Sequence, residues 1–471
     1  MKFFPFLFLL VVACGADTQN TEDLPPDAEN DGFVSENTGK DDAFLIKELS
    51  YEAICVLSFV NQSSEEELFD VVHKIPAKRI WEKKIGEDGK LGSADDHYFE
   101  TVEDLDNVSF VGFFTFRALE KHALANGYCP TLGQETLVPG EDEISRQIGE
   151  RSEQFVRERF DEDMTARRDA HAKSHGCVKA FVDVDNSALR EDEKIGVFAE
   201  NREFPAWIRF SNGNPAIQND EEKDARGFAL KLMEVPGEKV LEKQKGEKTQ
   251  DFLLINGQSF FVRTPSDYLE FSTKAFDGNP ITFFLSLNPL KFKFRELKNL
   301  LSIALAKPSS PITQYWSTTP YALGSGRAVK YSVRPCGDFE SGWPKDRDDN
   351  FLGQTLVDQL ASEDQCFEFL LQRQIDPIST PIEDATIEWE TVESPYVKVA
   401  QIRIPKQSFS SDEQMEFCEN LSFNPWHTLP AHRPLGNINR TRRIVYDMIS
   451  NLRHTLNQRT EVEPEGHINF N

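Results

Sequence analysis

The sequence is poor in positive charge. Its 52 Lys and Arg residues stand against 79 Asp and Glu residues, which leaves a net charge of −27 on 471 residues. A surface of this sign repels nucleic-acid phosphates at long range, which argues against nucleic acid as a partner. The chain also lacks the repeated long apolar runs of a multi-span membrane protein. With 39% hydrophobic residues, it is nevertheless too apolar for a disordered chain and long enough to bury a large core.

Several common catalytic signatures are missing. No GxxxxGK[ST], HExxH or GxSxG motif occurs, so a phosphate-binding loop, a zinc-protease helix and a serine-hydrolase elbow are not indicated. Cysteine is also scarce, with seven residues in all. Their spacing matches no zinc-binding template.

The first residues have the form of an export signal. Lys2 is followed by an apolar run from Phe3 to Val12, which is too short to cross a bilayer as a permanent helix. The run ends in Val11-Val12-Ala13-Cys14, which resembles the lipobox of bacterial lipoproteins. The resemblance implies a signal peptide over residues 1–13, a lipid on Cys14 and a membrane-anchored protein of the cell envelope, in the periplasm or at the outer membrane. The alternative is an ordinary signal cut after Ala16 and a secreted protein.

Either signal directs the chain to an oxidising compartment, where disulfides form. Six cysteines remain after Cys14, and an even number permits up to three bridges. A bridge between Cys55 and Cys129 would close the segment between them, and two free thiols are an equally good interpretation. The six are Cys55, Cys129, Cys177, Cys336, Cys366 and Cys418.

The amino-terminal third divides into a linker and a helical unit. Residues 14–42 are acidic and rich in Asn, Pro and Gly, which predicts a flexible linker. Over residues 43–130, short helical patterns alternate with a loop rich in Gly and Asp, which predicts a small all-α domain.

Four parts of this unit stand out: residues 57–61 (LSFVN), residues 75–80, the loop over residues 86–96 and residues 108–112 (VSFVG). Together they resemble a helix-hairpin-helix module. Such modules commonly bind the DNA backbone, because a tight Gly-x-Gly hairpin offers N–H groups to phosphate. Here Phe110-Val111-Gly112-Phe113 replaces that hairpin, and the loop over residues 86–96 is acidic. These differences favour a spacer or protein-contact role over DNA binding.

Residues 143–460 are predicted to form the main domain, followed by a carboxy-terminal tail over residues 461–471. Alternating and continuous apolar stretches predict strands of a mostly antiparallel sheet or barrel, and amphipathic stretches predict helices. The predicted strands cover residues 178–184, 206–210, 228–233, 251–262 and 397–404. The predicted helices cover residues 293–306, 350–360 and 441–456.

The last of these helices carries an unusual tyrosine. Val445, Met448, Leu452 and Leu456 form an apolar stripe at helical spacing, and Arg442, Tyr446 and Arg453 lie on an adjacent face. Nearby cations favour the phenolate form of tyrosine, which is a hard oxygen donor suited to ferric iron. The spacing alone fits an ordinary half-buried tyrosine better.

Three earlier stretches add to this observation: Arg168 to Lys173 (RDAHAK), Trp207 to Ser211 (WIRFS) and Asp224 to Lys231 (DARGFALK). In this order they resemble the haem-binding core of catalases. The Arg442, Tyr446 and Arg453 spacing resembles the proximal signature of the same family. The resemblance covers about residues 165–457. It implies an α+β fold, with a catalase-like antiparallel β-barrel and helices that bind haem b.

The resemblance also implies roles for single residues. Tyr446 would be the axial ligand of the haem iron, held as phenolate by Arg442. Arg168, Arg209 and Arg453 would pair with the haem propionates, a task suited to forked, permanently charged donors. His171 would move a proton between the two peroxide oxygens on the opposite face, oriented by Ser211.

Two positions of the expected distal pocket depart from the family pattern. Asn256 resembles the catalytic asparagine of catalases, but it falls one place later than in that family, and Ile255 stands in the family's position. A small backbone adjustment would bring the Asn256 amide over the iron; otherwise the pocket is altered. Ala170 replaces a bulkier residue, which widens the approach to the iron and admits something larger than hydrogen peroxide.

These features predict a haem enzyme that metabolises peroxide or organic hydroperoxide. The core is similar to catalase-related allene oxide synthases and to small catalase-like peroxidases. Three alternatives stay open: a true catalase that dismutates hydrogen peroxide, an enzyme that converts a lipid hydroperoxide as allene oxide synthases do, and a non-catalytic haem-binding envelope protein. The sequence gives no indication of the oligomeric state.

Overall fold

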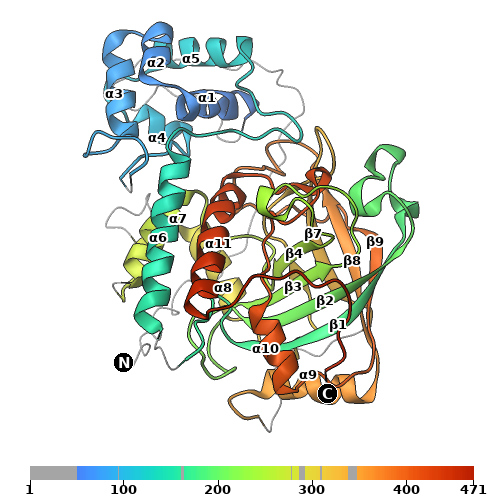
Figure 1. Cartoon of the computed structure of the whole chain (residues 1–471). Coiled ribbons are helices and arrows are strands. Elements are labelled where there is room, and N and C mark those ends of the chain that lie inside the picture. Colours follow the sequence, from blue (N-terminus) through green and yellow to red (C-terminus); the bar gives the residue numbers. More distant parts are fainter. Residues whose placement is uncertain are drawn as a thin grey trace, which may run out of the picture.

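The structure is a computed structural model that describes residues 50–93, 95–160, 164–276, 278–285, 292–307, 310–337 and 347–470. The predicted signal peptide, Cys14 and the predicted acidic linker lie outside the described residues. A group of helices at the amino-terminal end stands beside a β-barrel with further helices against its outside (Figure 1). This arrangement confirms the predicted α+β class. Within the described ranges, no helix is both long enough and apolar enough to cross a bilayer.

The amino-terminal helices are α1 (Tyr51–Gln62), α2 (Glu65–Val71), α3 (Lys74–Lys84), α4 (Val102–Asp106) and α5 (Phe113–Ala125). Side-chain oxygens of Ser50, Ser64 and Thr101 accept hydrogen bonds from the first backbone N–H groups of α1, α2 and α4, which fixes where these helices begin. The helices share a hydrophobic cluster of their own, with Phe59 and Phe116 at its centre.

The structure decides the pairing of four cysteines. Cys55 of α1 and Cys129, after α5, form a disulfide, so the two ends of the helical group are linked. A second disulfide joins Cys336 to Cys366. Cys177 and Cys418 are buried free thiols.

The barrel strands are β1 (Ser174–Val184), β2 (Glu203–Asn212), β3 (Arg226–Leu232), β4 (Gln250–Ile255), β5 (Tyr315–Trp316), β6 (Tyr321–Ala322), β7 (Ala328–Pro335), β8 (Gln365–Arg373) and β9 (Val397–Ile404). In the described part of the chain they pair in the order β5-β4-β3-β2-β1-β9-β8-β7-β6, and a further pairing of β5 with β7 closes the ring. All these pairings are antiparallel. The predicted antiparallel barrel is confirmed.

One predicted strand is wrong in its second half. The strand expected over residues 251–262 ends at Ile255. Asn256 accepts a hydrogen bond from the backbone N–H of Arg226 and donates its own N–H to the Arg226 carbonyl, after which the chain leaves the sheet. The apolar residues that follow, such as Phe260 and Phe261, pack against a separate helical cluster.

Alternation along the strands separates an inner from an outer face. Phe210, Phe228 and Phe252 belong to the main core with Phe367 and Phe369, and the rings of Phe210 and Phe228 meet edge to face at 5.3 Å. Since side chains alternate across a strand, Arg209, Ser211 and Gly227 face the outside of the barrel. The outer face of β2 and β3 therefore looks toward the surrounding helices.

The helices around the barrel are α6 (Glu141–Arg159), α7 (Pro265–Phe276), α8 (Phe294–Ala304), α9 (Phe351–Ser362), α10 (Asp412–Asn420) and α11 (Asn437–Leu456). α6 and α11 lie side by side (Figure 1). Their shared apolar cluster contains Val445 and Leu452, as the apolar stripe predicts, and also Ile449, which is not part of that stripe. Gly149 of α6 permits this approach, because a Cβ there would overlap the Met448 sulfur.

The predicted carboxy-terminal tail packs on the barrel over its described part, residues 461–470. Glu463 pairs with Lys231 at 2.7 Å. The Trp207 indole donates to the Gly466 carbonyl at 3.4 Å, and a ring nitrogen of His467 lies 2.9 Å from the Ala206 carbonyl oxygen. These contacts hold the segment against the outer face of β2 and β3.

Candidate functional site

His171 lies at the outer face of the barrel, immediately before β1. Its Nδ1 is 3.0 Å from the Ser211 hydroxyl oxygen, as expected for an orienting partner. His171 has a backbone φ of 59°, a left-handed conformation that non-glycine residues seldom adopt. Its N–H donates to the Gly213 carbonyl at 2.9 Å, and its carbonyl accepts from Arg209 at 2.8 Å. These bonds hold the strained backbone and aim the ring.

Gly227 makes room for that imidazole. It lies opposite Ser211 in the pairing of β2 with β3, on the same face. A Cβ at position 227 would lie 2.5 Å from His171 Nδ1 and 2.7 Å from the Ser211 oxygen. Only glycine lets the imidazole and the hydroxyl meet here.

The His171 imidazole is neutral at physiological pH. Burial lowers its pKa to about 3, and the positive charges of Arg209, Arg442 and Arg168 act in the same direction. His171 as a whole residue is half-buried. A neutral imidazole with one nitrogen held by a hydroxyl has its other nitrogen available to accept a proton.

The expected ligand tyrosine lies on α11. A terminal nitrogen of Arg442 donates to the Tyr446 phenol oxygen at 3.1 Å, and the other donates to the Asn439 side chain at 3.1 Å. Burial disfavours the charged Arg442, but interactions with Tyr446 and Tyr321 outweigh it and raise the pKa of the guanidinium. The same guanidinium lowers the pKa of His171. Arg442 therefore acts on Tyr446 through a hydrogen bond and on His171 through its charge.

The three arginines expected to bind propionates meet at the carboxy-terminal end of α10. Arg168 donates to the Glu419 carboxylate at 2.9 Å and to the Leu421 carbonyl at 2.6 Å. Arg453 donates to the carbonyls of Glu419 and Leu421. Arg209 lies 3.9 Å from the Glu419 carboxylate, and its buried Nε has no hydrogen-bond partner among the residues that the structure describes.

These residues fit an iron porphyrin with two carboxylates. Three guanidiniums face one protein carboxylate, which leaves positive charge for a dianion, and the orphaned Nε of Arg209 is a donor in need of an acceptor. Burial and the charge of Arg168 lower the pKa of Arg453 to about 9, although Glu419 opposes this effect. Tyr446 supplies a hard oxygen donor.

The outer face of β3 and β4, next to Arg209 and Gly227, is apolar. Ala229 lies opposite both Arg209 and Leu253 in the ladder, and Ile255 lies opposite Gly227. Ala229, Leu253 and Ile255 are only half-buried, although their strands lie inside the sheet. Such a surface suits the flat face of a macrocycle.

Of the three predicted catalytic residues, His171 and Ser211 contact each other, but the Asn256 side chain bonds to other residues. Its amide donates to the Ile303 carbonyl at 3.0 Å, and its amide oxygen accepts from the Arg226 N–H at 2.6 Å. Ile255 instead shares the outer face with Gly227 and Ser211. Of the two possibilities left by the sequence, this geometry favours an altered distal pocket.

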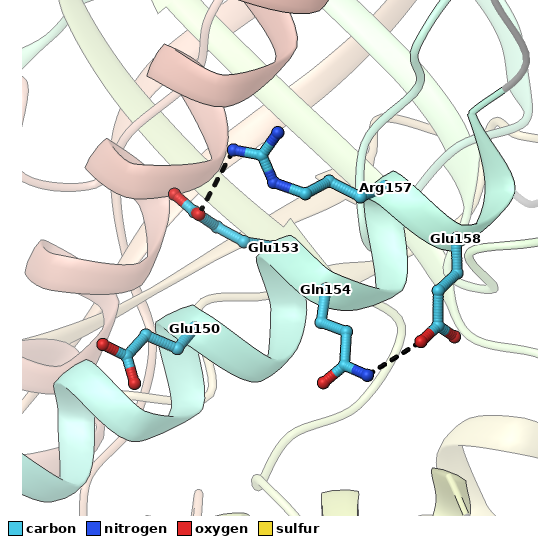
Figure 2. A pocket seen from close by; sticks show the side chains of 5 residues that line it. All are labelled: Glu150, Glu153, Gln154, Arg157 and Glu158. Carbon is cyan, nitrogen blue, oxygen red and sulfur yellow. Dashed lines mark hydrogen bonds and ion pairs between the residues drawn. The ribbon is translucent and has the colours of Figure 1, made fainter.

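The depression in Figure 2 lies away from these residues. Its lining comes from α6 alone, with an ion pair of 3.7 Å between Arg157 and Glu153 and a hydrogen bond of 2.8 Å from Gln154 to Glu158. In the part of the chain that the structure describes, no cluster of His, Cys, Asp and Glu side chains could hold a metal ion.

No family model and no curated protein matches this chain. The solved structures that are similar to it include two catalases. A fungal catalase is 17% identical over 69% of this chain and 65% of its own, with a TM-score of 0.47. Catalase A from Saccharomyces cerevisiae is 16% identical over 70% of this chain and 69% of its own, with a TM-score of 0.47. The chain thus spans less than two thirds of the first of them.

Three residues of the site were not predicted. Gly227 lies within the RGFA stretch that carries the resemblance, but only the ladder reveals that its missing Cβ makes room for His171. The sequence indicates Ile255 only as a departure from the catalase pattern, at the position where that family carries its asparagine. Glu419 has no sequence signal, because it is one of several acidic residues on a polar helix and lies far along the chain from Arg168.

Proposed function

We propose that the protein is a haem b enzyme that consumes peroxide or organic hydroperoxide. The observation that carries the proposal is that Arg442 bonds to Tyr446 and that its charge also acts on His171. His171 and Ser211 lie on the outer face of the barrel, Tyr446 lies on α11, and the Arg442 guanidinium donates to Tyr446 while it lowers the pKa of His171. When bound, haem supplies a ferric iron that binds and activates the peroxide.

Tyr446 is the residue that would ligate the iron. A terminal nitrogen of Arg442 donates a hydrogen bond to the Tyr446 phenol oxygen at 3.1 Å, which orients that oxygen. Arg168, Arg209 and Arg453 would hold the two propionates, since their charges exceed that of Glu419. These four arginines would fix the macrocycle between α11 and β2–β4.

His171 is the proton carrier. It is neutral because burial and the neighbouring guanidiniums lower its pKa to about 3, so it can accept the proton of the bound peroxide and return it to the departing oxygen. Ser211 orients the ring through Nδ1, which leaves Nε2 for the exchange. The second distal group of a typical catalase is not supplied by Asn256, whose amide is bonded to Ile303 and Arg226.

The same departure favours an organic hydroperoxide over hydrogen peroxide. Ile255 places an aliphatic side chain on the face that His171 occupies, and such a side chain contacts an alkyl chain better than a second water-like peroxide molecule. The proposed substrate class is therefore lipid or other organic hydroperoxides. Dismutation of hydrogen peroxide is the competing activity.

The proposal is tested with purified protein loaded with haemin. Hydrogen peroxide and a fatty-acid hydroperoxide are supplied in parallel, with oxygen evolution and organic products measured in both. Products from the organic hydroperoxide in excess of oxygen from hydrogen peroxide support the proposal. Oxygen evolution alone would make the protein a catalase, and an allene oxide would assign the isomerase reaction.

Two variants distinguish a haem enzyme from a protein that binds haem without catalysing a reaction. Tyr446→Phe is expected to change the Soret spectrum, because it removes the proposed ligand oxygen. His171→Ala should bind haemin with an unchanged Tyr446 signature and lose peroxide turnover by about 10²-fold or more. Equal turnover by His171→Ala and the unaltered protein would favour a non-catalytic haem-binding envelope protein.

The cellular setting is proposed from the sequence. A lipid on Cys14 would anchor the enzyme to a membrane of the cell envelope, where two disulfides are stable. DNA is not the proposed partner of the helical group, since an exposed Phe110 stands in the segment that replaces the Gly-x-Gly hairpin of DNA-binding modules. Metabolic labelling with a fatty acid, compared between the full chain and Cys14→Ser, tests the anchor.

A further inference from the structure

Arg168, Arg209 and Arg453 form an arginine cluster, and Glu419 is the carboxylate at its centre. It is the penultimate residue of α10, and its side chain is 13% exposed. One carboxylate oxygen lies 2.9 Å from Arg168, and the other lies 3.9 Å from both Arg209 and Arg167. No other acidic side chain of the described residues forms an ion pair with Arg168 or Arg209.

The end of α10 adds partial negative charge to this carboxylate. The backbone carbonyl oxygens of Glu419 and Leu421 both accept hydrogen bonds from Arg453, and that of Leu421 also accepts from Arg168. Carbonyl groups at the carboxy-terminal end of a helix carry the negative end of its dipole. The Glu419 carboxylate and the carbonyl groups of Glu419 and Leu421 thus supply the negative charge that stabilises the arginine cluster.

Glu419 does not fully neutralise the positive charge of the arginine cluster. Arg168 and Arg209 are themselves close enough to repel each other: burial and then Arg168 lower the pKa of Arg209, although Glu419 acts in the opposite direction. Burial and the charge of Arg168 also lower the pKa of Arg453, and Glu419 again acts in the opposite direction. Arginine keeps its charge at neutral pH. Glu419, with Glu461 acting on Arg453, therefore leaves net positive charge on these guanidiniums, which favours an anion beside them.

We propose that Glu419 is a built-in counter-ion, a positioning residue that stabilises the arginine cluster before a dianionic ligand binds and sets how tightly that ligand is held. The inference rests on the proposed function for the identity of the dianion, the two propionates of haem. It assigns Glu419 two opposite effects. Its charge stabilises the protein without ligand, and the same charge weakens the attraction of the cluster for propionate.

The test substitution is Glu419→Gln, which keeps the shape of the side chain and removes its charge. The haem-free variant should melt at a temperature lower by about 2–4 °C, because three guanidiniums lose their counter-charge. Its dissociation constant for haemin, measured from the Soret band, should fall by about tenfold at low salt. Added salt should shrink the difference, since salt screens these charges.

Haemin dimethyl ester is the probe that isolates the charge effect. It has the same macrocycle and iron but no carboxylates, so Glu419→Gln should leave its dissociation constant unchanged within about twofold. Glu419→Asp keeps the charge and should keep haemin affinity near that of the unaltered protein. Glu416→Gln is the matched control, because this exposed residue of α10 pairs only with Arg459 at the surface, and it should change neither quantity.

The results that overturn the inference are specific. They are an unchanged melting temperature of haem-free Glu419→Gln, or a haemin affinity that does not rise, or a rise that the dimethyl ester shares. Failure of the proposed function has another signature, in which the unaltered protein binds no haemin. In that case sulfate replaces haemin as the dianion: it should raise the melting temperature of Glu419→Gln more than that of the unaltered protein, and an equal rise would refute the counter-ion.

Discussion

The Nδ1 atom of His171 and the hydroxyl oxygen of Ser211 lie 3.0 Å apart above a glycine that has no side chain to separate them. Ser211 is fixed by its strand, and His171 is fixed by a strained backbone with a φ of 59°. The pair is therefore held on rigid structure before any substrate arrives. Preorganisation of this kind is typical of proton-transfer groups.

The first prediction concerns Gly227. Gly227→Ala places a methyl group 2.5 Å from His171 Nδ1 and 2.7 Å from the Ser211 oxygen, so the imidazole must move. Peroxide turnover of the haem-loaded protein should fall by about tenfold or more. The Soret spectrum should remain that of a tyrosine-ligated haem, because Tyr446 is on another element. Gly246→Ala is the control, since a Cβ there meets nothing within 4 Å.

The second prediction concerns pH. Burial and nearby arginines lower the pKa of His171 to about 3, which favours the neutral imidazole that accepts the proton. The reactive form is therefore fully present above this pKa and is lost only as the pH falls toward 3. The kcat/KM for peroxide should stay flat from about pH 5 to pH 8. An inflection near pH 6.5, the ordinary value for histidine, would contradict this assignment.

The sequence predicts much of this site because its motifs are local. The stretch from Trp207 to Ser211 lies on one strand, and the Arg442, Tyr446 and Arg453 spacing lies on one helix, so their geometry follows from the strand and helix periods. The apolar stripe on α11 likewise predicts the face that packs on α6, through Val445 and Leu452.

What the sequence leaves open depends on contacts between distant segments. Whether Ile255 or Asn256 shares a face with His171 depends on where β4 ends, and a slip of one residue exchanges the faces of a strand. The Glu419 ion pair joins residues that lie far apart in the chain, on α10 and before β1. The cysteine pairing is open for the same reason, because six cysteines allow 15 pairings.

The third prediction separates Ile255 from Asn256. Asn256→Ala removes hydrogen bonds to Ile303 and Arg226, so the free energy of unfolding should fall by about 1–3 kcal/mol. Turnover per bound haem should change by less than about threefold. Denaturant unfolding and turnover at matched haem loading measure the two effects. A loss of turnover without a loss of stability would restore Asn256 as a catalytic residue.

The reverse change introduces the missing amide. Ile255→Asn places a polar group on the face shared with Gly227 and His171, so turnover of hydrogen peroxide should rise relative to that of a fatty-acid hydroperoxide. Leu253→Asn, two residues earlier on the same face and opposite Ala229, is the matched control and should not shift this ratio. If both variants shift it equally, general polarity rather than position 255 selects the substrate.

The last prediction concerns Cys177 and Cys418, which pack in one buried cluster with Trp207. Gln414, one turn before Cys418 on α10, donates to the Cys177 carbonyl at 2.7 Å, which brings the two segments together. Burial, together with Cys418, raises the pKa of the Cys177 thiol well above its usual value, and a buried thiol that stays protonated reacts slowly. Peptide mapping after alkylation should therefore find Cys177 unmodified in the native protein and labelled after unfolding without reductant. The disulfide pairs Cys55–Cys129 and Cys336–Cys366 should take label only after reduction. A Cys177–Cys418 disulfide in the mapped protein would contradict the free-thiol assignment.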